Sequence, residues 1–296
     1  MTDSVTVTDQ RAPERASNRS GWIAFAGIAL LIAALVVLRR SLSLDSGDVA
    51  LVIAWGSLPL LTLSGISAGA AAGMWAVHVF GRVPRIAASV LAGSATGVLA
   101  SAAVFMLRGV PSSAILVLAL ALALSGALGG AIAAIRPAEI ARGGVPATLA
   151  ALLLFFVVAF NSSWLLPLFG ADGTAAGNHS ANGLLAGAQA LLIGLISGFV
   201  AYFTIRRSGA ACRWPVYMLA GGLPGLFYIV ADLFTRVGTT RLLSLAVSDT
   251  TVDRLVSTDL GAGRINTGLV LFFVGAITAM IAFGRTLKPA DPDSAG

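Results

Sequence analysis

Apolar residues along the chain gather into long runs that are separated by short polar segments. Most runs are about 20 residues long, which is the length of helix that crosses a hydrocarbon core about 30 Å thick. In lipid, every backbone N–H and C=O must be paired within the segment, and α-helices achieve this. The pattern predicts an all-α integral membrane protein, a polytopic bundle of about eight transmembrane helices. The expected spans are 21–39, 49–80, 84–107, 112–135, 146–169, 182–205, 214–236 and 265–285.

The second run is too long for a straight crossing. We expect a kink at Pro59, or a first part that lies tilted near the membrane surface, and seven or nine spans remain alternatives. The bundle is expected to occupy residues 21–285. Residues 1–20 are expected to form a disordered cytoplasmic tail, and residues 286–296 are expected to form a cytoplasmic C-terminal tail.

Two segments between the expected spans are predicted as outer loops, 170–182 and 237–263. The first is small and polar. The second mixes leucines with charges, so it is either an amphipathic helix on the outer surface or a plain connection.

The amino-acid composition also indicates a membrane protein, since 57% of the 296 residues are apolar and 11% are charged. A soluble protein of this size needs more polar surface. The net charge of +6 comes almost wholly from arginine, and we attribute it to contact with anionic lipid rather than with nucleic acid.

The placement of basic residues predicts the orientation. With the N-terminus inside, twelve of the 19 lysines and arginines fall in inner segments, and the pair Arg39–Arg40 is the main contrary feature. Both termini should therefore be cytoplasmic, in the cytoplasmic membrane of a bacterium.

Small residues spaced four apart let helix backbones approach closely, which is how helices associate in lipid. Such glycines occur in the second, third, fourth and sixth expected spans. The sixth also carries Gln189 opposite its glycines, so we expect both of its sides to meet protein and the helix to be central. The predicted packing glycines are Gly65, Gly69, Gly73, Gly93, Gly97, Gly126, Gly130, Gly183, Gly187, Gly194 and Gly198.

The seventh span carries a carboxylate, Asp232, with Arg236 one turn later. This spacing favours an ion pair near the outer surface that reaches water, and a cavity-lining or ion-coupling carboxylate is the alternative. Earlier in the span, "GGLPG" weakens the helix and could free carbonyls toward a cavity. The candidate cavity or coupling residues are Asp232, Arg236, Gln189, Gly221, Gly222, Pro224 and Gly225.

The chain contains neither GxxxxGK[ST] nor HExxH, and its histidines and Cys212 are scattered. We therefore expect no catalytic residue, metal or cofactor, and no enzyme activity. The leading hypothesis is a non-catalytic protein that docks other membrane proteins through its small-residue faces. The alternative is a transporter or permease-like subunit with a helix broken at 221–225, and a third is a lipid-acting enzyme that uses the outer loop.

Overall fold

The structure, a computed structural model, describes residues 11–44, 48–106, 112–210, 212–246 and 250–286. At 11–19, 41–44, 48–57, 112–114, 175, 237–246 and 250–263 it describes the backbone alone. All regular structure in these ranges is α-helical. The helices are α1 (Arg11–Leu44), α2 (Asp48–Val79), α3 (Arg85–Phe105), α4 (Ser112–Ala133), α5 (Ala138–Phe160), α6 (Ser162–Leu168), α7 (Ala175–Arg207), α8 (Trp214–Ala246) and α9 (Thr250–Gly284).

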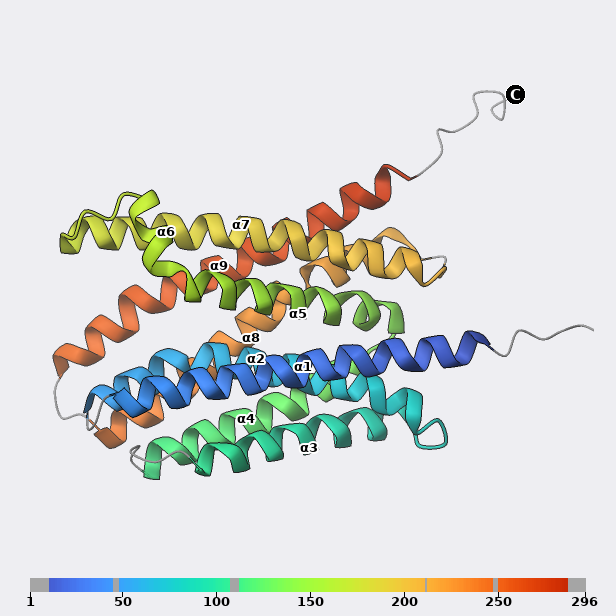
Figure 1. The fold of residues 1–296 in the computed structure, drawn as a ribbon, viewed down its shortest axis with the longest axis horizontal. Coiled ribbons are helices and arrows are strands. Elements are labelled where there is room, and N and C mark those ends of the chain that lie inside the picture. Colours follow the sequence, from blue (N-terminus) through green and yellow to red (C-terminus); the bar gives the residue numbers. More distant parts are fainter. Residues whose placement is uncertain (1–10, 45–47, 107–111, 211, 247–249, 287–296) are drawn as a thin grey trace, which may run out of the picture.

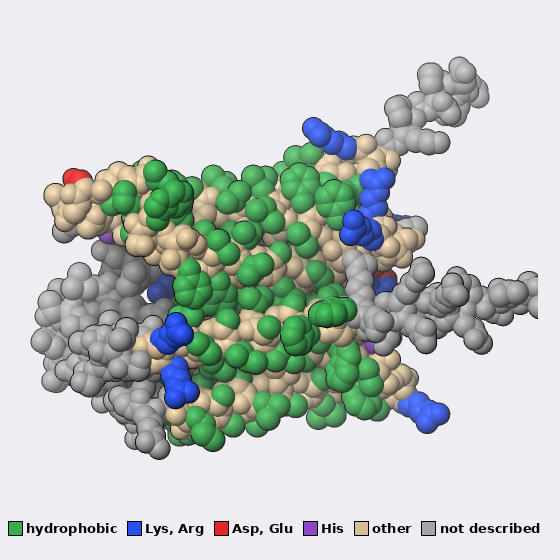
Figure 2. Space-filling model, viewed as in Figure 1, with side chains coloured by type: hydrophobic (Ala, Val, Ile, Leu, Met, Phe, Trp, Pro, Cys, Tyr) green, Lys and Arg blue, Asp and Glu red, His purple; other side chains and the backbone are tan. Residues whose placement is uncertain are grey.

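Eight of these helices contain a stretch that is long and apolar enough to cross a membrane. The short α6 does not. The space-filling view shows apolar side chains over the middle of the molecule and arginines toward its two ends (Figure 2). Exposed apolar side chains are stable in lipid, and charged ones remain near water. The prediction of a polytopic helical membrane bundle is confirmed.

The bundle is built around α2. Within its membrane stretch, Leu58–Val79, 83% of the residues are buried, against 28–56% in the other spans. It contacts α1, α3, α4, α5 and α8 (Figure 1). Its serines can be buried because their hydroxyls donate to carbonyls one turn earlier, as Ser67 Oγ does to Leu63 O at 2.7 Å.

The sixth span is therefore not the central helix, as the sequence predicted. Only 39% of Ala176–Arg207 is buried, because Leu191, Leu195 and Phe199 point outward and are 44–51% exposed. A leucine is as stable against lipid as against protein, so glycine on one face of a helix does not require protein on the other.

Several helices extend beyond the predicted spans. The first helix begins at Arg11, inside the segment expected to be disordered, and residues 1–10 lie outside the described residues. Alanine, arginine and glutamate favour helix there, and Pro13 falls in the first turn, where proline is tolerated. The second helix runs on through Pro59 without ending.

Both predicted outer loops are partly helical. α7 begins at Ala175 because Thr174 caps it, with the Thr174 hydroxyl accepting from Gly177 N at 3.0 Å. α8 continues to Ala246 and α9 begins at Thr250, so most of 237–263 prolongs two spans. The predicted amphipathic character of 237–263 concerns side chains that lie outside the described ones.

The described ends of the chain, the start of α1 and the end of α9, lie at one end of the bundle (Figure 1). We call this the termini end, and it also holds the connections at 80–84, 134–137 and 208–213. The turn between α5 and α6 and the loop before α7 lie at the other end, named the Trp164 end. Exposed tryptophans occur at both ends, as expected at the two membrane surfaces.

Candidate functional site

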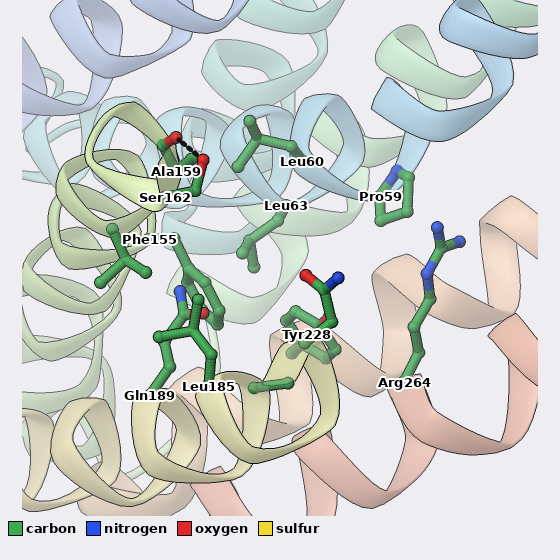
Figure 3. A pocket seen from close by; sticks show the side chains of 13 residues that line it. Pro59, Leu60, Leu63, Phe155, Ala159, Ser162, Leu185, Gln189, Tyr228 and Arg264 are labelled. Carbon is green, nitrogen blue, oxygen red and sulfur yellow. Dashed lines mark hydrogen bonds between the residues drawn. The ribbon is translucent and has the colours of Figure 1, made fainter. Parts of the chain in front are cut away.

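A cavity of about 350 Å³ opens near the Trp164 end, between helices from both halves of the chain. This volume is within the usual range of ligand pockets. We call it the Gln189 cavity (Figure 3). It is lined by Pro59, Leu60, Leu63, Phe155, Val158, Ala159, Ser162, Asn182, Leu185, Ala186, Gln189, Tyr228 and Arg264.

One face of α7 supplies the polar groups on one side. Asn182, Leu185, Ala186 and Gln189 are spaced i, i+3, i+4 and i+7, so they form a single helical stripe. Within the part of the chain that the structure describes, the Gln189 amide makes no hydrogen bond, whereas Asn182 Nδ2 donates to Asn178 O at 2.7 Å. The half-buried glutamine can therefore donate to and accept from a bound molecule.

Tyr228 of α8 lies between Gln189 and Arg264 in the close-up (Figure 3). Its ring stacks on Phe155 of α5, with the ring centroids 5.4 Å apart and the planes 18° apart. Stacking of this kind fixes the ring and so fixes the position of the phenol hydroxyl. The aliphatic part of the wall comes mainly from Leu60, Leu63 and Leu185.

Arg264 brings a positive charge to the cavity. It directly precedes the apolar run of α9, and arginines in such positions are expected near the membrane surface. The cavity thus combines an apolar wall, two amides, a phenol and a cation. Such a set suits an amphiphile whose head group is anionic, because arginine and amide donors bind phosphate oxygens directly.

Of the residues proposed from sequence, only Gln189 lines this cavity. Asp232 and Arg236 lie one and two turns beyond Tyr228 and form a salt bridge, with Arg236 Nε donating to Asp232 Oδ2 at 2.8 Å. The expected ion pair is present, but its carboxylate does not reach water, because the Asp232 side chain is only 3% exposed. It is the Arg236 side chain, 42% exposed, that reaches out.

The glycine-rich stretch of α8 faces α9 rather than a cavity. The helix is continuous through Pro224. A methyl group at Gly222 would come 2.8 Å from the Phe272 ring, and one at Gly225 would come 2.5 Å from Phe272 Cα. Gly221 similarly contacts Gly275. These glycines permit close packing of α8 on α9, and among the described residues the stretch 221–225 does not line the Gln189 cavity.

Glycines in α2, α3 and α4 meet one another in the same way. Gly69 lies against Gly126, and a methyl at Gly93 would come 2.6 Å from Gly130 Cα. Gly97 faces the backbone of α4, whereas Gly65 and Gly73 face Ser125 and Ser89. These contacts let three backbones approach closely.

In α7 the glycines divide into two pairs. Gly194 and Gly198 contact α9, whereas a methyl at Gly183 or Gly187 would meet nothing within 4 Å. The predicted packing contact is therefore absent at Gly183 and Gly187 among the described atoms. The spacing of the four glycines is that of one helix face, but α9 lies along only part of that face.

Sequence reasoning did not identify Asn182, Tyr228 or Arg264 as site residues. Asn182 and Gln189 lie two turns apart on one face of α7, and that spacing could have drawn attention to them. Arg264, as a lone charge at the start of an apolar run, could have been noted as well. Nothing in the sequence indicates that Tyr228 comes between them, since that depends on how α5, α7 and α8 pack.

Comparison with known proteins gives one match. The chain is 34% identical over 111 residues to phospho-N-acetylmuramoyl-pentapeptide-transferase of Clostridium perfringens, and the match covers 35% of this chain. The chain spans about a third of that relative's length, 34%. No protein-family model matches the chain, and no solved structure matches it.

This match contradicts the functional hypothesis drawn from sequence. A non-catalytic docking protein was predicted and enzyme activity was not expected, yet the matched relative is by its name a transferase. The absent motifs exclude only one route of nucleotide hydrolysis and one type of zinc protease. Group transfer needs neither motif, so their absence was not evidence against catalysis.

Proposed function

We propose that this protein is a multi-pass membrane transferase that acts on a lipid carrying a phosphate group. The observation that carries the proposal is the Gln189 cavity, where an apolar wall meets Arg264 and the Gln189 amide. The similarity to a transferase whose name specifies a phosphate-linked group supports the same class of reaction.

In this proposal the cavity binds the two parts of the substrate separately. The lipid chain packs against Leu60, Leu63 and Leu185, which are lining residues of α2 and α7. The phosphate oxygens accept hydrogen bonds from Arg264 and from the amide of Gln189. Arginine suits this role because its planar guanidinium can bind two phosphate oxygens at once.

The reaction transfers a phosphate-linked group to the lipid phosphate. An oxygen of the lipid phosphate attacks the phosphorus of a donor diphosphate, and the bond from that phosphorus to the leaving phosphate breaks. The charge that develops on the oxygens is stabilised by positioned cations and hydrogen-bond donors. Arg264 and Tyr228 are the lining residues that can provide this stabilisation.

The proposed setting is the cytoplasmic membrane of a bacterium, with both termini in the cytoplasm. Described arginines are more numerous at the termini end, where Arg82, Arg85 and Arg136 flank two loops, and cytoplasmic loops are enriched in basic residues. With this orientation the Gln189 cavity lies in the outer half of the membrane.

The test is a transfer assay on the full chain in lipid nanodiscs. A radiolabelled phosphosugar donor and a polyprenyl phosphate acceptor are supplied, and the label that moves into the organic phase is counted. Arg264→Gln should lower kcat/KM about 100-fold, because it removes a cation that stabilises the transition state. Gln189→Leu should lower it roughly tenfold, because one hydrogen bond to a charged group is lost.

The control is Arg285→Gln, which removes an exposed arginine at the opposite end of α9. It should leave the rate unchanged. No transfer by the wild-type protein with any phosphosugar donor would overturn the transferase proposal. Normal rates in both cavity variants would instead overturn the assignment of the reaction to this cavity.

A further inference from the structure

A second cavity, of about 250 Å³, lies at the termini end between α2, α3, α4 and α5. We call it the Arg85 pocket. His78, Arg85 and Arg142 line it together with Met74 and small residues of α4 and α5. We propose that the Arg85 pocket binds the phosphate group of an anionic phospholipid. This inference does not depend on the proposed transferase activity.

The first observation is how Arg85 is held. It is the first residue of α3, and its Nη2 donates to Ala133 O, at the end of α4, at 3.3 Å. Its Nε atom is buried and makes no hydrogen bond within the described part of the chain. A buried donor without a partner is unfavourable, and a phosphate oxygen would supply the missing acceptor.

The second observation is the charge around the pocket. Arg142 Nη1 lies 3.8 Å from Glu139 Oε1, so one carboxylate partly balances this cation. Arg85 then leaves the pocket with a net positive charge. His78 Nδ1 donates to Met74 O at 2.7 Å, since a carbonyl can only accept.

The third observation favours a lipid as the source of the phosphate. Apolar residues close in sequence to the lining residues His78 and Arg85 are exposed, with Val79, Phe80, Val83 and Ile86 all 41–68% exposed. They lie in or beside the connection from α2 to α3, at the end of two candidate spans, and the ends of spans are where lipid head groups are expected. Basic pockets between transmembrane helices at a membrane surface are typical sites for anionic head groups, whose acyl chains cover such apolar residues.

The experiment is native mass spectrometry of the full chain released from detergent. The probes are phosphatidylglycerol, phosphatidylcholine and inorganic phosphate, each added alone. We expect one tightly retained phosphatidylglycerol, weaker retention of phosphatidylcholine, and binding of inorganic phosphate only at far higher concentration. Arg142→Gln should weaken retention of phosphatidylglycerol about fivefold, and Arg85→Gln at least as much.

The matched control is Arg207→Gln, which removes another exposed arginine at the same end but outside the pocket. It should retain lipid as the wild type does. Because Arg85 also ties α3 to α4, thermal unfolding identifies any loss of fold in Arg85→Gln, and Arg142→Gln carries the test if that variant is unstable.

Tight binding of inorganic phosphate, without a preference for phosphatidylglycerol over phosphatidylcholine, would overturn the lipid as the ligand. It would show instead that the pocket binds free phosphate. Equal losses in Arg142→Gln and Arg207→Gln would overturn the proposal, because they would show only general attraction to a basic surface. Failure of all three probes to bind would also overturn it.

Discussion

The salt bridge between Asp232 and Arg236 is asymmetric at the scale of single residues. The carboxylate is almost fully buried, whereas the guanidinium is close to half exposed. Removing either partner leaves the other in a different environment. Without Arg236, the buried Asp232 carboxylate would have neither a cation nor water to offset the cost of its burial. Without Asp232, the exposed part of the Arg236 side chain could still be hydrated.

We therefore expect Arg236→Gln to destabilise the protein more than Asp232→Asn does. The first change should cost about 1–3 kcal/mol because it leaves a buried charge unpaired, and the second should cost under about 1 kcal/mol. Thermal unfolding in detergent at neutral pH measures both. The double variant should recover part of the loss from Arg236→Gln, and equal shifts for the two single variants would contradict this account.

The sequence was informative about this pair but not about the cavity beside it. Spacing of four residues on a helix brings Asp232 and Arg236 together whatever surrounds them. Burial of the carboxylate depends on how α8 packs in the bundle, and α2 meets α8 at the neighbouring residue, where Thr62 Oγ1 donates to Ala231 O at 3.5 Å. The grouping of Gln189, Tyr228 and Arg264 likewise depends on three helices from separate parts of the chain.

At the scale of helices, hydropathy located the spans well because the apolar runs match the thickness of lipid. It located the helix ends less well, since helix continues into water wherever caps and propensities allow. Glycines spaced four apart predicted some of the helix faces that pack closely, but not every such glycine makes a packing contact. Gly126 contacts α3, whereas a methyl group at Gly183 would meet none of the described atoms within 4 Å, although each belongs to a pair of glycines spaced four apart.

This contrast gives a matched pair of substitutions. Gly126→Ala should destabilise the protein by about 1–3 kcal/mol, because the added methyl would come 2.6 Å from Gly97 Cα and must push two backbones apart. Gly183→Ala should be neutral or slightly stabilising, since alanine favours helix over glycine. Thermal unfolding in detergent compares them, and a similar loss of stability at both positions would contradict the packing described for α3 and α4.

At the scale of the whole molecule, the orientation in the membrane is a prediction with a convenient reporter. Cys212 is the single cysteine, and it lies between α7 and α8 at the termini end. Burial raises the pKa of its thiol, the Glu139 carboxylate raises it further, and Arg142 opposes the shift. The reactive thiolate therefore forms only at higher pH than for an ordinary cysteine, and labelling should accelerate as the pH rises.

Labelling from one side of the membrane then distinguishes the two orientations. In right-side-out vesicles at alkaline pH, a membrane-impermeant maleimide should leave Cys212 unmodified until detergent is added, because basic loops favour the cytoplasmic side. On a Cys212→Ser background, Ala171→Cys places a thiol at the Trp164 end, and it should be labelled in intact vesicles. The reverse result would show the opposite orientation in the membrane. The Arg85 pocket would then lie at the outer surface and the Gln189 cavity in the inner half of the membrane. Since both cavities are defined by contacts within the bundle, their lining would stay the same and only the source of their ligands would change.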